Sequence, residues 1–157
     1  MRTTLSTRVR SYKQALDADC EVILPVDHHV VRELKPGAKH RTAVGDIDPG
    51  YQAVDIGQMA AEAYTKKITD AKTIVWNGPM GVFEIPPFDE GTKAIALAVA
   101  EATDNGATSI IGGGDSASAV NKLGLQDRVS HISTGGGASL EFLEGKVFKC
   151  LEILDEK

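Results

Sequence analysis

The sequence has few cysteines, no long apolar run and no secretory signal. Its two cysteines, Cys20 and Cys150, lie far apart in the chain, so neither a disulfide framework nor a cysteine zinc site is predicted. No stretch approaches the roughly 20 apolar residues that a membrane span requires, and the N-terminus lacks the apolar core of a signal peptide. We therefore expect a protein of the reducing cytoplasm that does not associate with membranes.

An excess of positive charge is also missing. The 17 Lys and Arg residues are outnumbered by 22 Asp and Glu residues, which leaves a net charge of −5, so a nucleic-acid partner is not expected. The four histidines show no metal-ligand spacing, and no Ser/His/Asp arrangement can be inferred. At 157 residues, with 42% apolar and 25% charged residues, the chain has the composition of a globular domain.

The N-terminal third contains a predicted helix, a predicted strand and a long loop. A stripe at helical spacing is formed by Leu5, Val9, Tyr12 and Leu16. This stripe predicts an amphipathic surface helix within residues 1–20. The apolar run at residues 21–26 does not alternate with polar residues, which favours a buried strand of a parallel sheet. Residues 35–50 are charged and hold two Pro-Gly steps, so they predict a loop, with a possible short edge strand at residues 42–44.

Beyond residue 57 the chain repeats one pattern of strand, glycine-rich turn and helix. The strand-like runs at residues 73–76, 108–111 and 131–133 each lead into a glycine cluster, and helical spacing follows. Such alternation predicts an α/β fold of the three-layer, Rossmann-like kind, a doubly wound and mostly parallel sheet with helices on both faces. Because the clusters follow strands, we expect them at one edge of the sheet, where ligands bind in such folds.

The glycine clusters at residues 112–114 and 135–137 are typical of phosphate sites. Each precedes a helix whose first amides lack partners and carry partial positive charge. Neither the P-loop pattern nor the dinucleotide fingerprint is matched, because Gly145-Lys146 is followed by Val147 and the sixth residue from Gly112 is Ala117. The alternative is that the glycines serve only tight turns and close packing.

Two carboxylates accompany these turns. Asp115 directly follows three glycines, where it could either cap the helix or hold Mg²⁺ beside a bound polyphosphate. Glu84 lies beyond the turn that follows Asn77, where it could accept hydrogen bonds from ribose hydroxyls or simply face solvent. The residues alone do not decide between the two roles of Asp115 or between the two roles of Glu84.

At these motifs the chain resembles phosphoglycerate kinases, in their C-terminal, nucleotide-binding half. The matching segments are WNGPMGVFE (76–84), IGGGDS (111–116) and HISTGGGASLEFLEGK (131–146), with weaker support from VILPVD (22–27) and VDIG (54–57). The resemblance begins near residue 20. It divides the chain into a weakly matching N-terminal helix, residues 1–20, and a partial C-terminal domain, residues 21–157.

The resemblance implies a glycolytic enzyme that transfers a phosphoryl group reversibly between ATP and the carboxylate of 3-phosphoglycerate, with Mg²⁺. It assigns the nucleotide phosphates and the metal to Gly113, Gly114, Asp115 and Ser116, with Asp115 as the metal ligand. It assigns the ribose to Glu84, a phosphate contact to Asn77, and the walls of an adenine pocket to Val54 and Val82. It assigns catalytic stabilisation of the moving phosphoryl group to Thr134, Gly135, Gly136 and Gly137.

The resemblance also implies that parts of the family's enzyme have no counterpart here. These are the N-terminal domain that binds 3-phosphoglycerate and the start of the C-terminal domain, with a lysine-bearing glycine loop. The sheet is then incomplete, and we expect a fragment of a longer enzyme or association with another chain. Two alternatives are a nucleotide-binding or interaction module without chemistry, and a protein that binds another phosphorylated metabolite.

Overall fold

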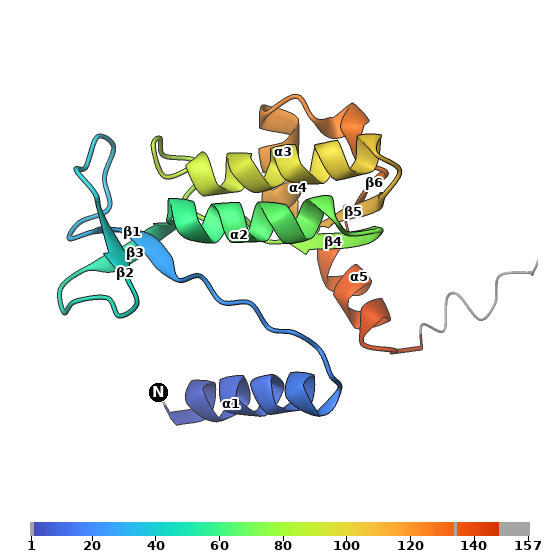
Figure 1. Cartoon of the computed structure of the whole chain (residues 1–157), viewed down its shortest axis with the longest axis horizontal. Helices are drawn as coiled ribbons and strands as arrows, with labels where there is room; N and C mark the ends of the chain where they lie inside the picture. The colour runs from blue at the N-terminus through green and yellow to red at the C-terminus, as the bar shows by residue number, and fades with distance from the viewer. Residues whose placement is uncertain (1, 134, 148–157) are drawn as a thin grey trace, which may run out of the picture.

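The fold is shown by a computed structural model that describes residues 2–133 and 135–147 (Figure 1). The elements are α1 (Arg2–Asp17), β1 (Asp27–Val31), β2 (Arg41–Val44), β3 (Gln52–Ile56), α2 (Gln58–Thr69), β4 (Thr73–Asn77), α3 (Glu90–Asp104), β5 (Thr108–Gly112), α4 (Gly114–Lys122), the 3-10 turn η1 (Gln126–Arg128), β6 (His131–Ser133) and α5 (Gly136–Leu143). No helix in these two ranges has the length and apolar character needed to cross a bilayer.

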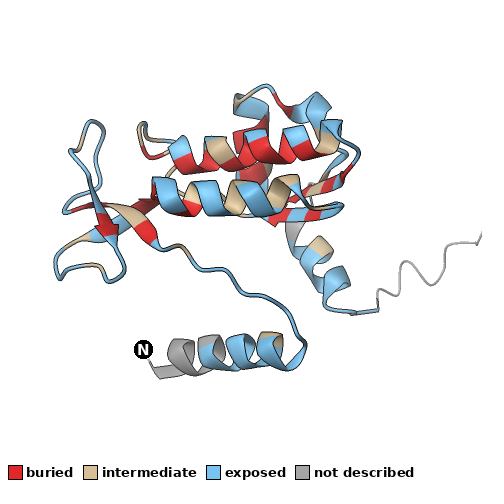
Figure 2. Ribbon diagram, viewed as in Figure 1, coloured by how far each residue is buried: buried red, intermediate tan, exposed pale blue. Residues whose placement is uncertain are grey.

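The predicted parallel sheet is present as β4-β5-β6, and this confirms the α/β fold class. Helices α2 and α3 lie above it in Figure 1, and α5 lies below. The main core forms where α2 and α3 pack on the sheet, around Trp76, Val99 and Ile111. The red segments of Figure 2 trace this core along α3 and the strands.

In the sequence, Asn105-Gly106 and Gly145 are typical helix-stop signals, and two helices end at them. Helix α3 ends at Asp104, and its cap residue Asn105 is followed by Gly106 with φ of 94°. Helix α5 ends at Leu143, and Gly145 follows with φ of 78°. A positive φ costs glycine little, so these residues terminate helices through local backbone chemistry alone.

A second, antiparallel sheet of order β2-β1-β3 was not part of the prediction. The short strand expected at residues 42–44 is confirmed as part of β2, which is an edge strand of this sheet. Asp27 begins β1 and is 2% exposed. Its carboxylate accepts hydrogen bonds from the amides of Met59 (3.1 Å) and Ala60 (2.8 Å), so it caps α2 from a distant part of the chain.

The buried strand expected at residues 21–26 is wrong. Residues 21–25 belong to no helix or strand, and Leu24 and Val26 are 67% and 49% exposed. An apolar run becomes a strand only where a neighbouring strand accepts its backbone hydrogen bonds, and β1 begins after the run, at Asp27. The N-terminal helix is confirmed as α1, but Val9 and Leu16 of its apolar stripe are 63% and 58% exposed.

Candidate functional site at the carboxyl edge of the parallel sheet

The register of the parallel sheet places the carboxyl ends of its three strands directly opposite one another. Asn77 of β4 is opposite Gly112 of β5, and Gly112 is opposite Ser133 of β6. The three glycine-rich turns therefore leave neighbouring strands at the same edge. The predicted placement of the clusters is confirmed.

The Asn77 side chain lies directly against the second glycine cluster. A Cβ atom added to Gly112 would stand 3.2 Å from Asn77 Nδ2, and one added to Gly113 would stand 3.3 Å from Asn77 Oδ1. Gly113 also has φ of 88°, which side-chain-bearing residues rarely adopt. The glycines thus let an exposed amide side chain and a backbone turn approach each other closely.

Ser116 joins the first two glycine-rich turns from inside the protein. It is fully buried in the first turn of α4, and its Oγ accepts a hydrogen bond from the Gly78 amide at 2.7 Å. The hydroxyl is therefore committed to an internal contact. What Ser116 offers toward the sheet edge is its backbone amide, because the first amides of a helix have no partner within the helix.

Two helices begin at this edge. The amide of Ala117 donates to Gly113 O at the start of α4, and that of Ser139 donates to Gly135 O at the start of α5. The backbone amides that precede Ala117 in α4 and Ser139 in α5 lie in the first turn of each helix. There the helix supplies no acceptor for them, and the helix dipole places partial positive charge at this end. Gly135 and Gly137 are exposed beside them. Thr134, predicted to act with these glycines, lies outside the described residues.

Asp115 is exposed in the first turn of α4, and within the described ranges its carboxylate makes no hydrogen bond or ion pair. Residues 2–133 and 135–147 hold no group of three or more His, Cys, Asp or Glu side chains that could bind a metal by themselves. Mg²⁺ is commonly held by one or two carboxylates together with phosphate oxygens. A free carboxylate beside two phosphate-favouring helix ends fits that donor set.

The segment after β4 docks on the end of β3. The Val82 amide donates to Val54 O at 2.8 Å. Val54 is 3% exposed and packs with Val31 and Phe88, whereas Val82 is partly buried and Glu84 is exposed. Of the two predicted adenine-pocket residues, Val82 therefore presents an accessible side chain, and Val54 supports the segment from within.

Asp55 is a residue that the sequence prediction missed. It is 2% exposed, and its carboxylate accepts hydrogen bonds from the amides of Gly91 (2.8 Å) and Ile56 (2.9 Å). A Cβ at Gly81 would stand 2.3 Å from Asp55 Oδ1, so the segment that bears Val82 rests on this carboxylate. Burial raises the pKa of Asp55 to about 6. An aspartate flanked by Val54 and Ile56 in a short apolar run that leads into Gly57 was the available signal.

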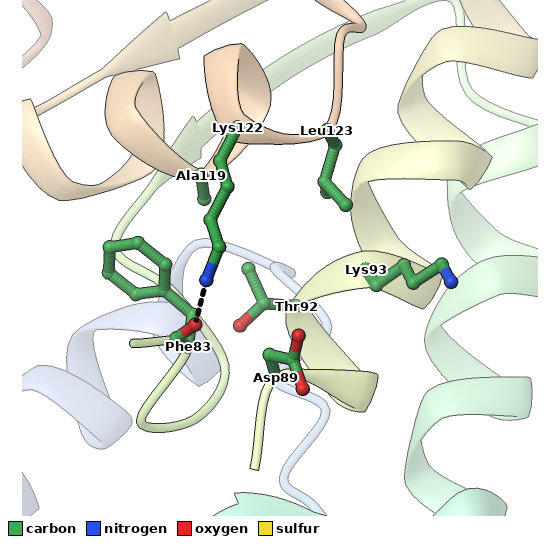
Figure 3. A pocket seen from close by; sticks show the side chains of 7 residues that line it. All are labelled: Phe83, Asp89, Thr92, Lys93, Ala119, Lys122 and Leu123. Atoms are coloured by element: carbon green, nitrogen blue, oxygen red, sulfur yellow. Dashed lines mark hydrogen bonds between the residues drawn. The ribbon is translucent and has the colours of Figure 1, made fainter. Parts of the chain in front are cut away.

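A small pocket lies between the same segment and helices α3 and α4 (Figure 3). Its lining residues are Phe83, Asp89, Thr92, Lys93, Ala119, Lys122 and Leu123. Lys122 Nζ donates to Phe83 O at 3.1 Å across it. The pocket has a volume of about 20 Å³, close to that of one water molecule, so it serves to tie α4 to the segment and is too small for a nucleotide.

The family of the chain follows from comparison with known proteins. The family model described as phosphoglycerate kinase matches residues 3–146, a range that includes every part of the site described above. The chain belongs to the phosphoglycerate kinase family. Its relatives include the phosphoglycerate kinase of Thermosipho africanus, 53% identical over 139 residues, and that of Rhodopirellula baltica, 55% identical over 136 residues.

Solved phosphoglycerate kinases share the fold. The structure from Coxiella burnetii matches with a TM-score of 0.90 and 40% identity, over 98% of this chain and 39% of its own. The structure from Pyrococcus horikoshii matches with a TM-score of 0.74 and 33% identity, over 96% of this chain and 37% of its own. The Thermosipho and Rhodopirellula matches cover 87% and 85% of this chain and 35% and 34% of the relatives. The chain thus spans about a third of the length of these phosphoglycerate kinases.

Proposed function

We propose that this chain is the nucleotide-binding part of a phosphoglycerate kinase and binds Mg-ADP and Mg-ATP at the carboxyl edge of β4-β6. One observation carries the proposal. The register places Asn77, Gly112 and Ser133 opposite one another, and it thereby brings two helix N-termini and a free carboxylate to the same edge of the sheet. Backbone amides in such an arrangement favour phosphate groups.

Most of the residues predicted for the nucleotide have a role in this binding. The amides of Gly114, Asp115 and Ser116 at the start of α4 face the nucleotide phosphates, with Asn77 beside them. Asp115 is the residue that would hold Mg²⁺, which neutralises phosphate charge when bound. Val82 contacts the base and Glu84 accepts hydrogen bonds from the ribose.

The complete enzyme would transfer a phosphoryl group between ATP and the carboxylate of 3-phosphoglycerate, reversibly and within glycolysis in the cytoplasm. In that reaction the bond between the γ-phosphorus and the bridging oxygen of ATP breaks, and a bond from phosphorus to a carboxylate oxygen forms. Thr134 and the amides of Gly135, Gly136 and Gly137 at the start of α5 stabilise the charge of the moving group. The 3-phosphoglycerate would be bound by the part of such enzymes that this chain does not span.

Titration calorimetry tests the binding step. We expect the chain to release heat on titration with MgADP, and Asp115→Asn to weaken binding of MgADP far more than binding of ADP in EDTA. Asp46→Asn is the matched control, because Asp46 is also exposed but follows β2 in the other sheet. No binding at millimolar MgADP, or an equal loss with and without Mg²⁺, would contradict the proposal.

A further inference from the structure

The segment from Gly78 to Phe83 is attached to helix α4 at both of its ends. The Gly78 amide donates to Ser116 Oγ at 2.7 Å in the first turn of α4. At the other end Lys122, the last residue of α4, donates from Nζ to Phe83 O at 3.1 Å. Ser116 and Lys122 are separated by about 9 Å along the helix axis, because each residue adds about 1.5 Å. One helix therefore holds both the start and the end of the segment.

The middle of the segment is held by other elements. Thr92 of α3 is 1% exposed, and its Oγ1 accepts hydrogen bonds from the amides of Met80 (3.0 Å) and Gly81 (3.3 Å). The Val82 amide donates to Val54 O of β3 at 2.8 Å. All of these bonds hold backbone amides. A segment fixed at so many points is ordered before any ligand binds, and such order lowers the entropic cost of binding.

The Lys122 bond acts on the peptide group that leads into Glu84. Phe83 O belongs to the planar unit between Phe83 and Glu84, so a donor to this oxygen sets the orientation of the backbone that carries the Glu84 side chain. No other donor of residues 2–133 or 135–147 bonds to this carbonyl. Phe83 is buried and Glu84 is exposed. Lys122 therefore orients the backbone from which an exposed carboxylate extends.

Figure 3 shows how the Lys122 side chain reaches the carbonyl. From the end of α4 it passes Ala119, and its ammonium group points at Phe83 O. Lys93 also lines the pocket, but its ammonium group points away from it. A hydrogen bond from an ammonium group is stronger than one between neutral groups. The two lysines of the pocket thus differ in whether they hold the segment.

We propose that Lys122 is a positioning residue for recognition of the nucleoside. By holding the Phe83 carbonyl, it keeps Glu84 within reach of the ribose hydroxyls, while the first turn of the same helix faces the nucleotide phosphates. The spacing between the ribose contact and the phosphate contact is then set by α4. This inference rests on the proposed function, because that function assigns the ribose to Glu84 and the phosphates to the start of α4.

Titration calorimetry with two nucleotides tests this role. MgADP carries both ribose hydroxyls, whereas the magnesium complex of 2′,3′-dideoxy-ADP carries neither. Lys122→Met retains an unbranched apolar side chain and removes the donor. We expect it to weaken binding of MgADP about fivefold or more, and binding of the dideoxy nucleotide by less than about twofold. The reason is that only MgADP has hydroxyls for Glu84 to bind.

Three further variants separate positioning from a general loss of structure. Lys93→Met is the matched control and should leave both affinities unchanged. Lys122→Arg retains a charged donor and should recover most of the MgADP affinity. In a chain that already carries Glu84→Ala, Lys122→Met should have almost no further effect on MgADP binding, because residues that act as one unit are not additive. Circular dichroism checks that each variant retains its fold.

Hydrogen exchange tests the positioning without nucleotide. The amides of Phe83 and Ile85 donate to Gly81 O and Val82 O within the segment. In Lys122→Met they should exchange about threefold faster or more, because the end of the segment opens more often. Exchange within β5 (Thr108–Gly112) should not change, since this strand does not contact Lys122 through the bond that is removed.

Equal losses of affinity for the two nucleotides would overturn the proposal, as would unchanged exchange at residues 83–85. Equal effects of Lys122→Met and Lys93→Met would also overturn it. The failure of the proposed function gives a different result, which is that the unsubstituted chain does not bind MgADP, and this role of Lys122 would then fail with it. Binding of MgADP that does not depend on Lys122 contradicts the positioning role alone.

Discussion

Ser116 and Gly78 lie 38 residues apart in the sequence and are joined by a hydrogen bond of 2.7 Å from the Gly78 amide to the Ser116 hydroxyl. The bond ties the turn after β4 to the start of α4. Because Ser116 is fully buried, water cannot replace the hydroxyl as an acceptor. The relative position of two parts of the proposed phosphate site therefore depends on one side chain.

Ser116→Ala should destabilise the protein and weaken nucleotide binding. The substitution leaves the Gly78 amide without its acceptor, which costs about 1–3 kcal/mol of unfolding free energy. Urea unfolding followed by circular dichroism measures the loss. Ser118→Ala is the control, since Ser118 is exposed on the same helix. A Ser116→Ala variant as stable as the control would show that the hydrogen bond contributes nothing.

Gly113→Ala should lower the unfolding free energy by more than the strain of a positive φ alone would. Gly113 has φ of 88° and ψ of 144°, a backbone conformation that essentially only glycine adopts and that costs other residues about 1–3 kcal/mol. Here the new atom also meets Asn77 Oδ1 at 3.3 Å. Gly37→Ala separates the two effects, because Gly37 has φ of 72° and no atom within 4 Å of an added Cβ. We expect both variants to lose stability in urea, but only Gly113→Ala to lose MgADP affinity in calorimetry.

Asp55 should make stability depend on pH between about 4 and 6. Burial raises its pKa from 3.8 to about 6 in the folded protein, with Glu90 and Asp89 adding to the effect. In that range the folded state binds more protons than the unfolded state, so the contribution of Asp55 to the unfolding free energy decreases as the pH rises, by about 2–3 kcal/mol in total.

The difference in unfolding free energy between the protein and Asp55→Asn measures this contribution. Relative to the Asn variant, the unsubstituted protein should become less stable as the pH rises from 4 to 7. A constant difference over this range would mean that burial does not raise the pKa of Asp55 in the folded protein.

The sequence predicted those parts of the fold that depend on local backbone chemistry. The glycines at residues 106 and 145 end helices because they accept a positive φ, and this property needs no tertiary contact. The strand-like runs that precede the glycine clusters are likewise present, as β4, β5 and β6. The motifs were sufficient to indicate the phosphoglycerate kinase family, which the comparisons confirm.

Contacts between distant segments explain what sequence reasoning missed. The β2-β1-β3 sheet was missed because β1 and β3 are short and carry His28, His29 and Asp55 among their apolar residues, so neither forms a continuous apolar run. The capping roles of Asp27 and Asp55 were missed because their acceptor oxygens meet amides 32 to 36 residues away. Similarly, nothing in the residues around Ser116 shows that its hydroxyl is turned inward to Gly78 and away from a ligand.

By itself, the sequence determined where the strands of the parallel sheet end and which turns have the backbone freedom to approach a phosphate, because glycine content acts within a few residues. The tertiary structure decided whether an apolar run becomes a strand. Residues 21–26 have the composition of a buried strand, yet they remain outside both sheets, because a strand is stabilised by the neighbour that pairs with it and no described segment supplies one.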